Sequence, residues 1–97
     1  MLTSKQRAAL RGMANGLPTL FQVGKAGVTP ELVQAMDDAL AARELIKARV
    51  LDNCLLSARE AAEMLSGRTR SEVVQVIGSR LVLYRKAKKP VIELPKG

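Results

Sequence analysis

Apolar side chains recur every three or four residues in three stretches of the 97-residue chain, which is the spacing of one helix face. The stripe is clearest in the second stretch, where Leu32, Met36 and Leu40 follow one another at four-residue steps. Each stretch opens on a side chain that can cap a helix. We therefore expect three helices, namely residues 3–15 capped by Thr3 or Ser4, residues 29–43 capped by Thr29 before Pro30, and residues 57–67 opened by a Ser57/Glu60 capping box.

Between these stretches, shorter apolar runs are typical of β-strands. From residue 44 to 51 apolar residues alternate with Lys47 and Arg49, a period of two that predicts a half-buried strand with a basic outer face. Gly78-Ser79 is a tight, glycine-first turn between two β-rich runs and predicts an antiparallel hairpin. The remaining expected strands are residues 19–23, 73–77 and 81–84.

The order helix, strand, helix, strand, helix, strand, strand predicts a two-layer α/β domain with a mixed four-stranded sheet. A chain of this length supports one hydrophobic core, so we expect a single domain over residues 1–97. After the last strand comes a basic C-terminal segment, residues 85–97, in which residues 90–95 are expected to form a short extended piece between prolines.

Composition narrows the range of possible functions. The chain has no histidine and one cysteine, Cys54, which excludes zinc sites of the Cys/His type, Ser-His-Asp triads and disulfide frameworks. Asp37 and Asp38 are adjacent in a predicted helix and point to different faces, so they do not form a catalytic carboxylate pair. We therefore expect a protein that is not an enzyme and has no catalytic residues, no metal or other cofactor and no small-molecule substrate.

The N-terminus lacks an apolar signal core, and no apolar run approaches the roughly 18 residues that cross a bilayer. An unpaired cysteine suits a reducing compartment. These features predict a cytoplasmic protein with no membrane partner, and we expect it to be a monomer.

The formal net charge of +7 is concentrated at the two ends of the chain. Residues 1–29 carry four basic residues and no acid (+4), residues 30–72 six basic and eight acidic residues (−2), and residues 73–97 six basic residues and one acid (+5). If the fold brings both ends together around residues 24–27, they form a basic face, the usual footprint of a partner with a phosphate backbone. The alternative is a solubilising surface.

The tetrapeptide Gly24-Lys25-Ala26-Gly27 leaves a predicted strand and leads into a predicted helix. Glycines let a backbone approach a phosphate closely, and Lys25 would add a positive charge, as in the Gly-x-x-Gly loop that clamps nucleic acid in KH domains. The helix that starts at Thr29 would add the unpaired backbone N–H groups of its first turn to the same site. An ordinary turn that needs a positive φ explains the glycines equally well.

Three runs in order, 23–29, 44–50 and 76–85, resemble the CRM domain, the YhbY-type RNA-binding family, over about residues 1–95. The resemblance implies a fold similar to the C-terminal domain of translation initiation factor three. It also implies a bacterial protein that associates with precursors of the large (50S) ribosomal subunit, and a Gly-x-x-Gly loop, here Gly24, Lys25, Ala26 and Gly27, that contacts RNA. Residues 55–69 match no family signature, so no role is transferred to the arginines at 59, 68 and 70.

Other basic residues could extend such a contact, although any one of them could equally be a solvated surface residue. They are Arg7 and Arg11 on one helix face, Lys47 and Arg49 on one strand face, and the run Arg85, Lys86, Lys88 and Lys89. With one Phe and one Tyr, the chain favours phosphate and shape recognition over base stacking. Together with the resemblance, which implies the ribosomal role, these features predict a protein that binds ribosomal RNA and assists large-subunit assembly. The alternative is an adaptor that docks on a ribosomal protein or an assembly factor.

Overall fold

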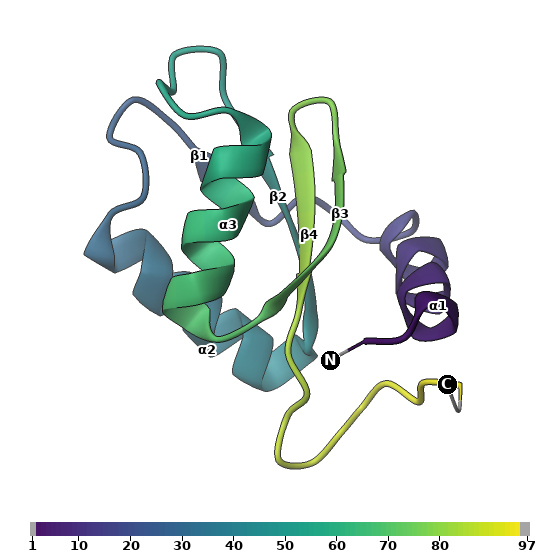
Figure 1. Ribbon diagram of the computed structural model, residues 1–97. Coiled ribbons are helices and arrows are strands. Elements are labelled where there is room, and N and C mark those ends of the chain that lie inside the picture. The colour runs from purple at the N-terminus through teal and green to yellow at the C-terminus, as the bar shows by residue number, and fades with distance from the viewer. Residues whose placement is uncertain (1, 96–97) are drawn as a thin grey trace.

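Three helices and a four-stranded mixed sheet follow one another in the predicted order, in a computed structural model that describes residues 2–95 (Figure 1). The predicted α/β class is confirmed. The elements are α1 (Ser4–Ala14), β1 (Phe21–Val23), α2 (Pro30–Arg43), β2 (Leu45–Val50), α3 (Ala58–Thr69), β3 (Glu72–Ile77) and β4 (Arg80–Tyr84).

Side-chain caps fix where the three helices begin. Thr3, not Ser4, caps α1, and its hydroxyl accepts from the N–H of Gln6 while the Gln6 side chain accepts from the Thr3 N–H. Ser57 and Glu60 make the same reciprocal pair at α3. Thr29 caps α2 ahead of Pro30. These caps satisfy backbone donors that a helix terminus leaves without partners, so the predicted starts are confirmed.

Two of the predicted boundaries were wrong. α3 continues past Gly67 to Thr69, because a glycine inside a helix costs only about 1 kcal/mol and the helix ends instead on Arg70, which is left-handed (φ 56°, ψ 41°). β1 begins at Phe21 rather than at residue 19. Residues 85–95, called the C-terminal segment below, contain no helix or strand, and residues 96–97 of the predicted basic tail lie outside the described residues.

The strand order is β1-β2-β4-β3, with β1 parallel to β2 and the other pairs antiparallel. Val23 pairs with Val50, and Leu45 at the other end of β2 pairs with Tyr84. The loops that follow β1 and β2 and the β3–β4 turn therefore lie together at one end of the sheet, at the top of Figure 1. The C-terminal segment leaves β4 at the opposite end.

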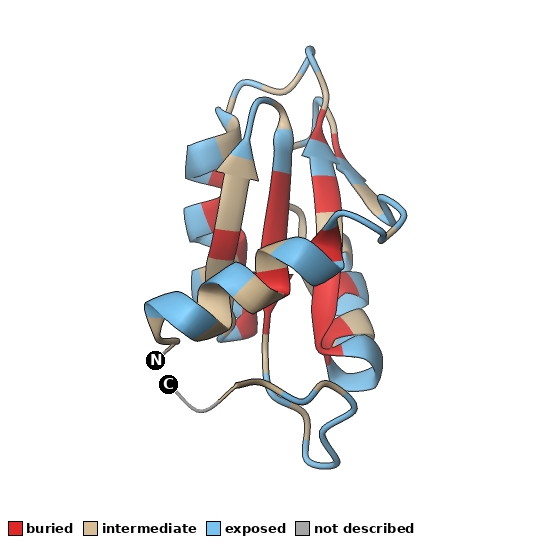
Figure 2. Cartoon of the chain, turned by 90° about the vertical axis from the view of Figure 1, so that its right-hand side faces the viewer, coloured by how far each residue is buried: buried red, intermediate tan, exposed pale blue. Residues whose placement is uncertain are grey.

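The two faces of the sheet are covered differently (Figure 2). α2 and α3 pack on one face over the larger core cluster, which includes Met36, Ile46 and Leu83. α1 crosses the other face over a smaller cluster that includes Leu10 and Tyr84, with part of the C-terminal segment packed against it. Because α1 is short, it leaves the end of this second face near the β3–β4 turn exposed, as the pale residues at the strand ends in Figure 2 show.

Candidate functional site

Residues 24–27 form a tight turn directly after β1. The N–H of Gly27 donates to the carbonyl of Gly24 at 2.9 Å, which places Lys25 and Ala26 at the two central, exposed positions. The turn is held to the sheet on its N-terminal side, where the N–H of Leu51 donates to the carbonyl of Val23 at 2.9 Å. The 24–27 turn is thus a fixed projection at one end of the sheet with a lysine at its tip.

The two glycines of the 24–27 turn have different structural requirements. Gly27 has a φ of 71°, a left-handed conformation that other residues adopt at a cost. Gly24 has no such φ, and a Cβ added to it would lie 3.6 Å from Cδ1 of Leu51 and 3.9 Å from Oδ1 of Asn53, ordinary van der Waals distances. The backbone therefore explains the glycine at 27, whereas neither conformation nor internal space requires one at 24.

The N-terminus of α2, which follows the turn, has few donors to offer a phosphate. Pro30 has no N–H, the N–H of Leu32 donates to the Thr29 hydroxyl at 3.1 Å, and the N–H of Val33 donates to the Thr29 carbonyl at 3.0 Å. The Glu31 N–H remains, beside its own carboxylate. Thr29 therefore serves the helix cap, which leaves the helix terminus few donors for a phosphate.

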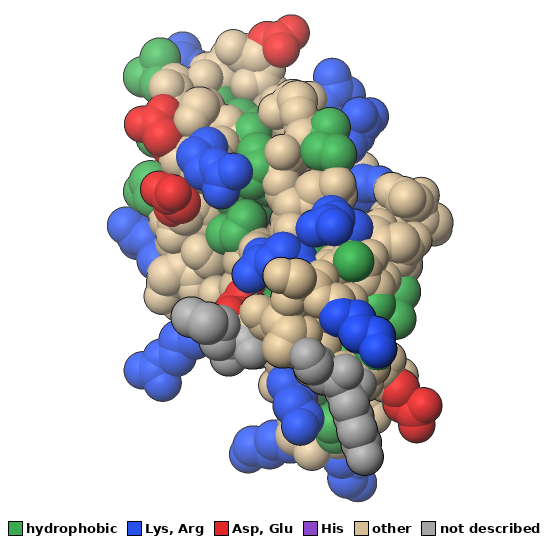
Figure 3. All heavy atoms as spheres, turned by 45° about the vertical axis from the view of Figure 1, so that its right-hand side comes forward, with side chains coloured by type: hydrophobic (Ala, Val, Ile, Leu, Met, Phe, Trp, Pro, Cys, Tyr) green, Lys and Arg blue, Asp and Glu red, His purple; other side chains and the backbone are tan. Residues whose placement is uncertain are grey.

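The prediction that both basic ends of the chain converge on the 24–27 turn was wrong. The turn extends from the end of the sheet where Val23 pairs with Val50, whereas Arg85 follows Tyr84, which pairs with Leu45. The two ends of β2 lie roughly 17 Å apart at about 3.3 Å per residue. Lysine and arginine side chains are instead distributed along the whole face seen in Figure 3.

Three of the expected basic residues make contacts within the fold. Arg85 donates to the Asp37 carboxylate at 2.5 Å, to the Asp37 carbonyl at 3.0 Å and to the Thr69 carbonyl at 2.7 Å, which ties β4 to α2 and α3. The guanidinium of Arg7 donates to the carbonyl of Val73 in β3. The ammonium of Lys47 donates to the carbonyl of Ala14 at 3.2 Å, at the end of α1. Arg11 lies half-buried in the last turn of α1, four residues after Arg7.

The lysines that follow Arg85 are exposed on the C-terminal segment, namely Lys86, Lys88 and Lys89. Glu44 holds this segment in place. Glu44 is buried, and its carboxylate accepts from the N–H groups of Ala87 (3.0 Å), Val91 (2.5 Å) and Ile92 (2.8 Å). Burial acts to raise the pKa of Glu44, but these N–H donors and the charge of Lys86 outweigh it, so the pKa is lowered. A carboxylate that the sequence reasoning did not single out thus fixes the course of the lysine-bearing segment.

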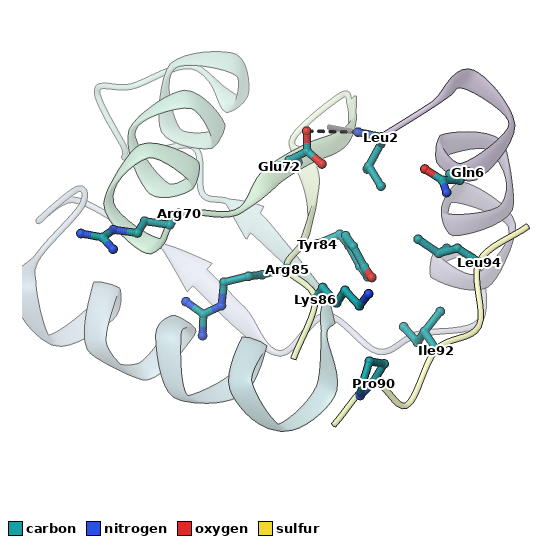
Figure 4. A pocket seen from close by; sticks show the side chains of 10 residues that line it. All are labelled: Leu2, Gln6, Arg70, Glu72, Tyr84, Arg85, Lys86, Pro90, Ile92 and Leu94. Atoms are coloured by element: carbon teal, nitrogen blue, oxygen red, sulfur yellow. Dashed lines mark hydrogen bonds between the residues drawn. The ribbon is translucent and has the colours of Figure 1, made fainter. Parts of the chain in front are cut away.

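A hollow of about 700 Å³ lies between α1, the start of β3 and the C-terminal segment (Figure 4). Its lining combines apolar side chains such as Leu2, Ile92 and Leu94 with Lys86. Tyr84 projects into it, and burial together with the carboxylates of Glu44 and Glu72 raises the pKa of Tyr84. This hollow is at the opposite end of the sheet from the 24–27 turn.

One basic residue near the turn was missed by the sequence reasoning. Arg80 pairs directly with Arg49 across β2 and β4, and both side chains are exposed. The two-residue turn at Gly78-Ser79 puts Arg80 at the first position of β4, but the register against β2 is a long-range property that no local pattern contains. Within residues 2–95, no three His, Cys, Asp or Glu side chains come together as metal ligands, and no helix is long and apolar enough to cross a membrane.

Comparison with known proteins extends over almost the whole chain. The CRS1 / YhbY (CRM) domain matches residues 2–85. The "Probable RNA-binding protein YqeI" of Bacillus subtilis is 47% identical over 96 residues, covering 98% of this chain and 100% of that protein. An "RNA-binding protein" of Haemophilus influenzae is 32% identical over 95 residues, covering 98% and 96% of the two chains.

A solved structure agrees in fold as well as in sequence. The solution structure of SAV1595 from Staphylococcus aureus, described as a candidate RNA-binding protein, superposes with a TM-score of 0.82. The two chains are 49% identical, over 98% of this chain and 100% of that one. Since the domain match, the sequence identity and the shared fold all cover most of the chain, this protein belongs to the CRS1 / YhbY (CRM) domain family.

Proposed function

We propose that this protein binds RNA by its phosphate backbone at the 24–27 turn. The observation that carries the proposal is Gly24, a position where the fold has room for a Cβ and where the backbone does not need glycine. Without a side chain, the backbone at residue 24 can be approached closely by a phosphate beside Leu51 and Asn53. A phosphate that approaches this side would meet the exposed backbone of Lys25 and Ala26 and the Lys25 ammonium.

Charges at the same end of the sheet support this site. Arg49 and Arg80 lie on the strand ends beside the turn, and both are exposed. Lys86, Lys88 and Lys89 form a separate basic surface at the other end, which a structured RNA could reach while it is bound at the turn. Lys47 lies in the middle of β2 between the two, bonded to the end of α1, and Arg11 lies in the last turn of that helix. We assign Arg7, Thr29 and Arg85 chiefly to the fold, because their polar groups are engaged there.

We further propose that the RNA is ribosomal and that the protein assists assembly of the large (50S) ribosomal subunit in the cytoplasm of a bacterium. The sequence resemblance suggests this role, and the relatives described above are named for RNA binding rather than for an enzymatic reaction. A binder of phosphate backbone suits assembly, because it can hold a folded RNA segment without reading its sequence. We propose that it acts as a monomer and needs no cofactor.

The turn is tested by a Gly24→Ala, Lys25→Ala double variant in a fluorescence anisotropy titration with a fragment of large-subunit ribosomal RNA. Lys5→Ala is the matched control, since Lys5 is an exposed lysine on α1 and its loss changes the charge equally. We expect the double variant to bind about tenfold more weakly and the control to stay within about twofold, with equal unfolding midpoints. A double variant that binds as tightly as the parent would overturn the proposal.

The assembly role is tested by sedimentation of a tagged chain in bacterial extract. We expect it to travel with large-subunit precursors and to be released when exposed RNA is digested by ribonuclease. Retention on the particle after digestion would show that protein contacts hold it, as in the adaptor alternative. Absence from the precursor fractions would contradict the ribosomal role while leaving RNA binding at the turn to its own test.

A further inference from the structure

Four residues form a row across the sheet on the face away from α2 and α3, and we call them the arginine row. Gln22 pairs with Arg49, Arg49 with Arg80, and Arg80 with Ile77. Their neighbours along the strands, such as Ala48 and Leu81, are buried in the core cluster under α2 and α3, so the row points to the opposite, open face. All four members are exposed.

The centre of the row brings two like charges together. Side chains directly opposite on antiparallel strands have Cβ atoms about 4.5–5.5 Å apart, and like charges there repel each other. In the described part of the chain the salt bridge is that of Arg85 with Asp37, so neither Arg49 nor Arg80 has a carboxylate partner. An anion between the two guanidinium groups would remove the repulsion, and arginine is well suited to phosphate because its donors match phosphate geometry.

A small hollow lies beside these arginines, over the neighbouring row of paired residues Lys47, Val82 and Gln75. Its volume is about 140 Å³, roughly that of four or five water molecules at about 30 Å³ each. The buried Val82 forms its apolar floor and the exposed Ile77 part of its wall. Asn15 at the end of α1 and Gln75 on β3 supply side-chain amides, while Lys47 is held to α1 by its bond to Ala14. The hollow is too small for a drug-sized ligand but suits a single flat ring.

Apolar surface, amide groups and a neighbouring pair of arginines are together the chemistry that holds one unpaired nucleotide. The base would contact Val82 and Ile77, and amides can both donate to and accept from its edge. In duplex RNA the bases are stacked and paired, so a base enters such a hollow only from a single-stranded segment. The site needs no aromatic platform, in keeping with the low aromatic content of the chain.

The arginine row also lies next to the proposed phosphate contact. Gln22 is the second residue before Gly24 on β1, and Arg49 is its partner on the adjacent strand. Neighbouring strands lie about 4.8 Å apart. An RNA strand that crosses the 24–27 turn can therefore continue over the end of the sheet onto the open face.

We infer that the open sheet face beside α1 binds one unpaired nucleotide, with its phosphate between Arg49 and Arg80 and its base in the hollow over Val82. This inference rests on the RNA binding proposed above and names the form of RNA that the protein selects, which is a structured RNA with an unpaired segment. Arg80 and Ile77 are the residues that distinguish this form from a continuous duplex.

Two RNAs with the same number of phosphates test the inference, a hairpin with an unpaired loop and a fully paired duplex. Arg80→Gln removes one of the two charges of the row. Ile77→Asn removes an apolar wall without a change of charge, and because Ile77 is 62% exposed, its replacement leaves the core intact. Arg68→Gln is the matched control, since Arg68 is exposed on α3, behind the sheet. Each affinity is measured by fluorescence anisotropy at one salt concentration.

We expect the parent to prefer the hairpin about tenfold. Arg80→Gln and Ile77→Asn should each lose most of that preference, whereas Arg68→Gln should keep it and weaken both RNAs equally. Equal affinity of the parent for both RNAs, or an Arg80→Gln variant indistinguishable from Arg68→Gln, would overturn the nucleotide site and leave the 24–27 turn standing. Failure of the parent to bind either RNA would instead overturn the proposed function itself.

Discussion

The guanidinium of Arg85 lies 2.5 Å from the carboxylate of Asp37 and also donates to the backbone carbonyls of Asp37 and Thr69. In the sequence Arg85 opens a basic run and is indistinguishable from the lysines that follow it. In the fold it joins the end of β4 to the middle of α2 and the end of α3. The same run therefore contains one structural cation and three exposed ones.

Replacement of Arg85 by alanine should destabilise the protein. The ion pair itself is half-exposed and contributes little, but the carbonyl of the buried Thr69 would lose its donor. We expect Arg85→Ala to lower the free energy of unfolding by about 1–3 kcal/mol and Arg85→Lys by less, measured by urea denaturation. Lys88→Ala, which removes an exposed charge from the same segment, is the control and should change stability by less than about 0.5 kcal/mol. Equal stability of Arg85→Ala and the control would contradict the structural role.

Glu44 should make stability depend on pH in the acid range. Its folded-state pKa is lowered, so the unfolded chain takes up the proton first, and the stabilisation is present above the unfolded pKa of about 4.3. It is lost as the pH falls through the lower folded-state pKa. The difference in unfolding free energy between the parent and Glu44→Gln should therefore shrink between about pH 5 and pH 3. Tyr84, which lies near the carboxylate, stays neutral over this range because its pKa is raised. A constant difference would show that the charge of Glu44 is unimportant.

The backbone of Glu44 allows a second, independent test. Its φ is 65° and its ψ −37°, a conformation that residues other than glycine rarely adopt. Glu44→Ala and Glu44→Gly both remove the carboxylate, but only glycine adopts the positive φ without strain. We expect Glu44→Gly to be about 1 kcal/mol more stable than Glu44→Ala in urea denaturation, the reverse of the order in an ordinary helix or strand. An alanine variant at least as stable as the glycine variant would show that the strain is absent.

RNA affinity should fall steeply with salt. Each phosphate that a lysine or arginine neutralises releases counterions, so the logarithm of the affinity should decline linearly with the logarithm of the salt concentration. The expected slope is about −0.7 to −0.9 per contact, and Lys25→Ala should reduce its magnitude by about one contact. Titrations at several salt concentrations measure both slopes. An affinity insensitive to salt would exclude recognition of the phosphate backbone.

Local features of the fold could be predicted from the sequence because they depend on neighbouring residues. The capping pair of Ser57 with Glu60 is complete within four residues, and the alternation in β2 is visible in the chain itself. The sequence left Thr3 and Ser4 as alternative caps of α1, and the pair of Thr3 with Gln6 emerged from the structure. The end of α3 was placed wrongly because Gly67 is a common stop signal, whereas the actual stop is Arg70 in a left-handed conformation. No local rule favours arginine at such a position.

The candidate site could be predicted only where it consists of consecutive residues. The 24–27 turn, with its two glycines, is such a run of consecutive residues. Only the structure shows that the backbone conformation calls for glycine at position 27, whereas position 24 has room for a side chain. The arginine row depends on the register of β2 against β4, and the anchor of the C-terminal segment on Glu44, over 40 residues earlier in the chain. Such contacts arise from tertiary packing, which periodicity and charge counts do not contain.

The most direct test of the central claim is an NMR titration of the ¹⁵N-labelled protein with a fragment of large-subunit ribosomal RNA that has an unpaired loop. We expect the amide resonances of Lys25 and Ala26 to shift most, followed by those of β2 and β4 beside the arginine row, as the complex saturates. Saturable binding that leaves the amides of the 24–27 turn unshifted, with the changes confined to other surfaces, would contradict it.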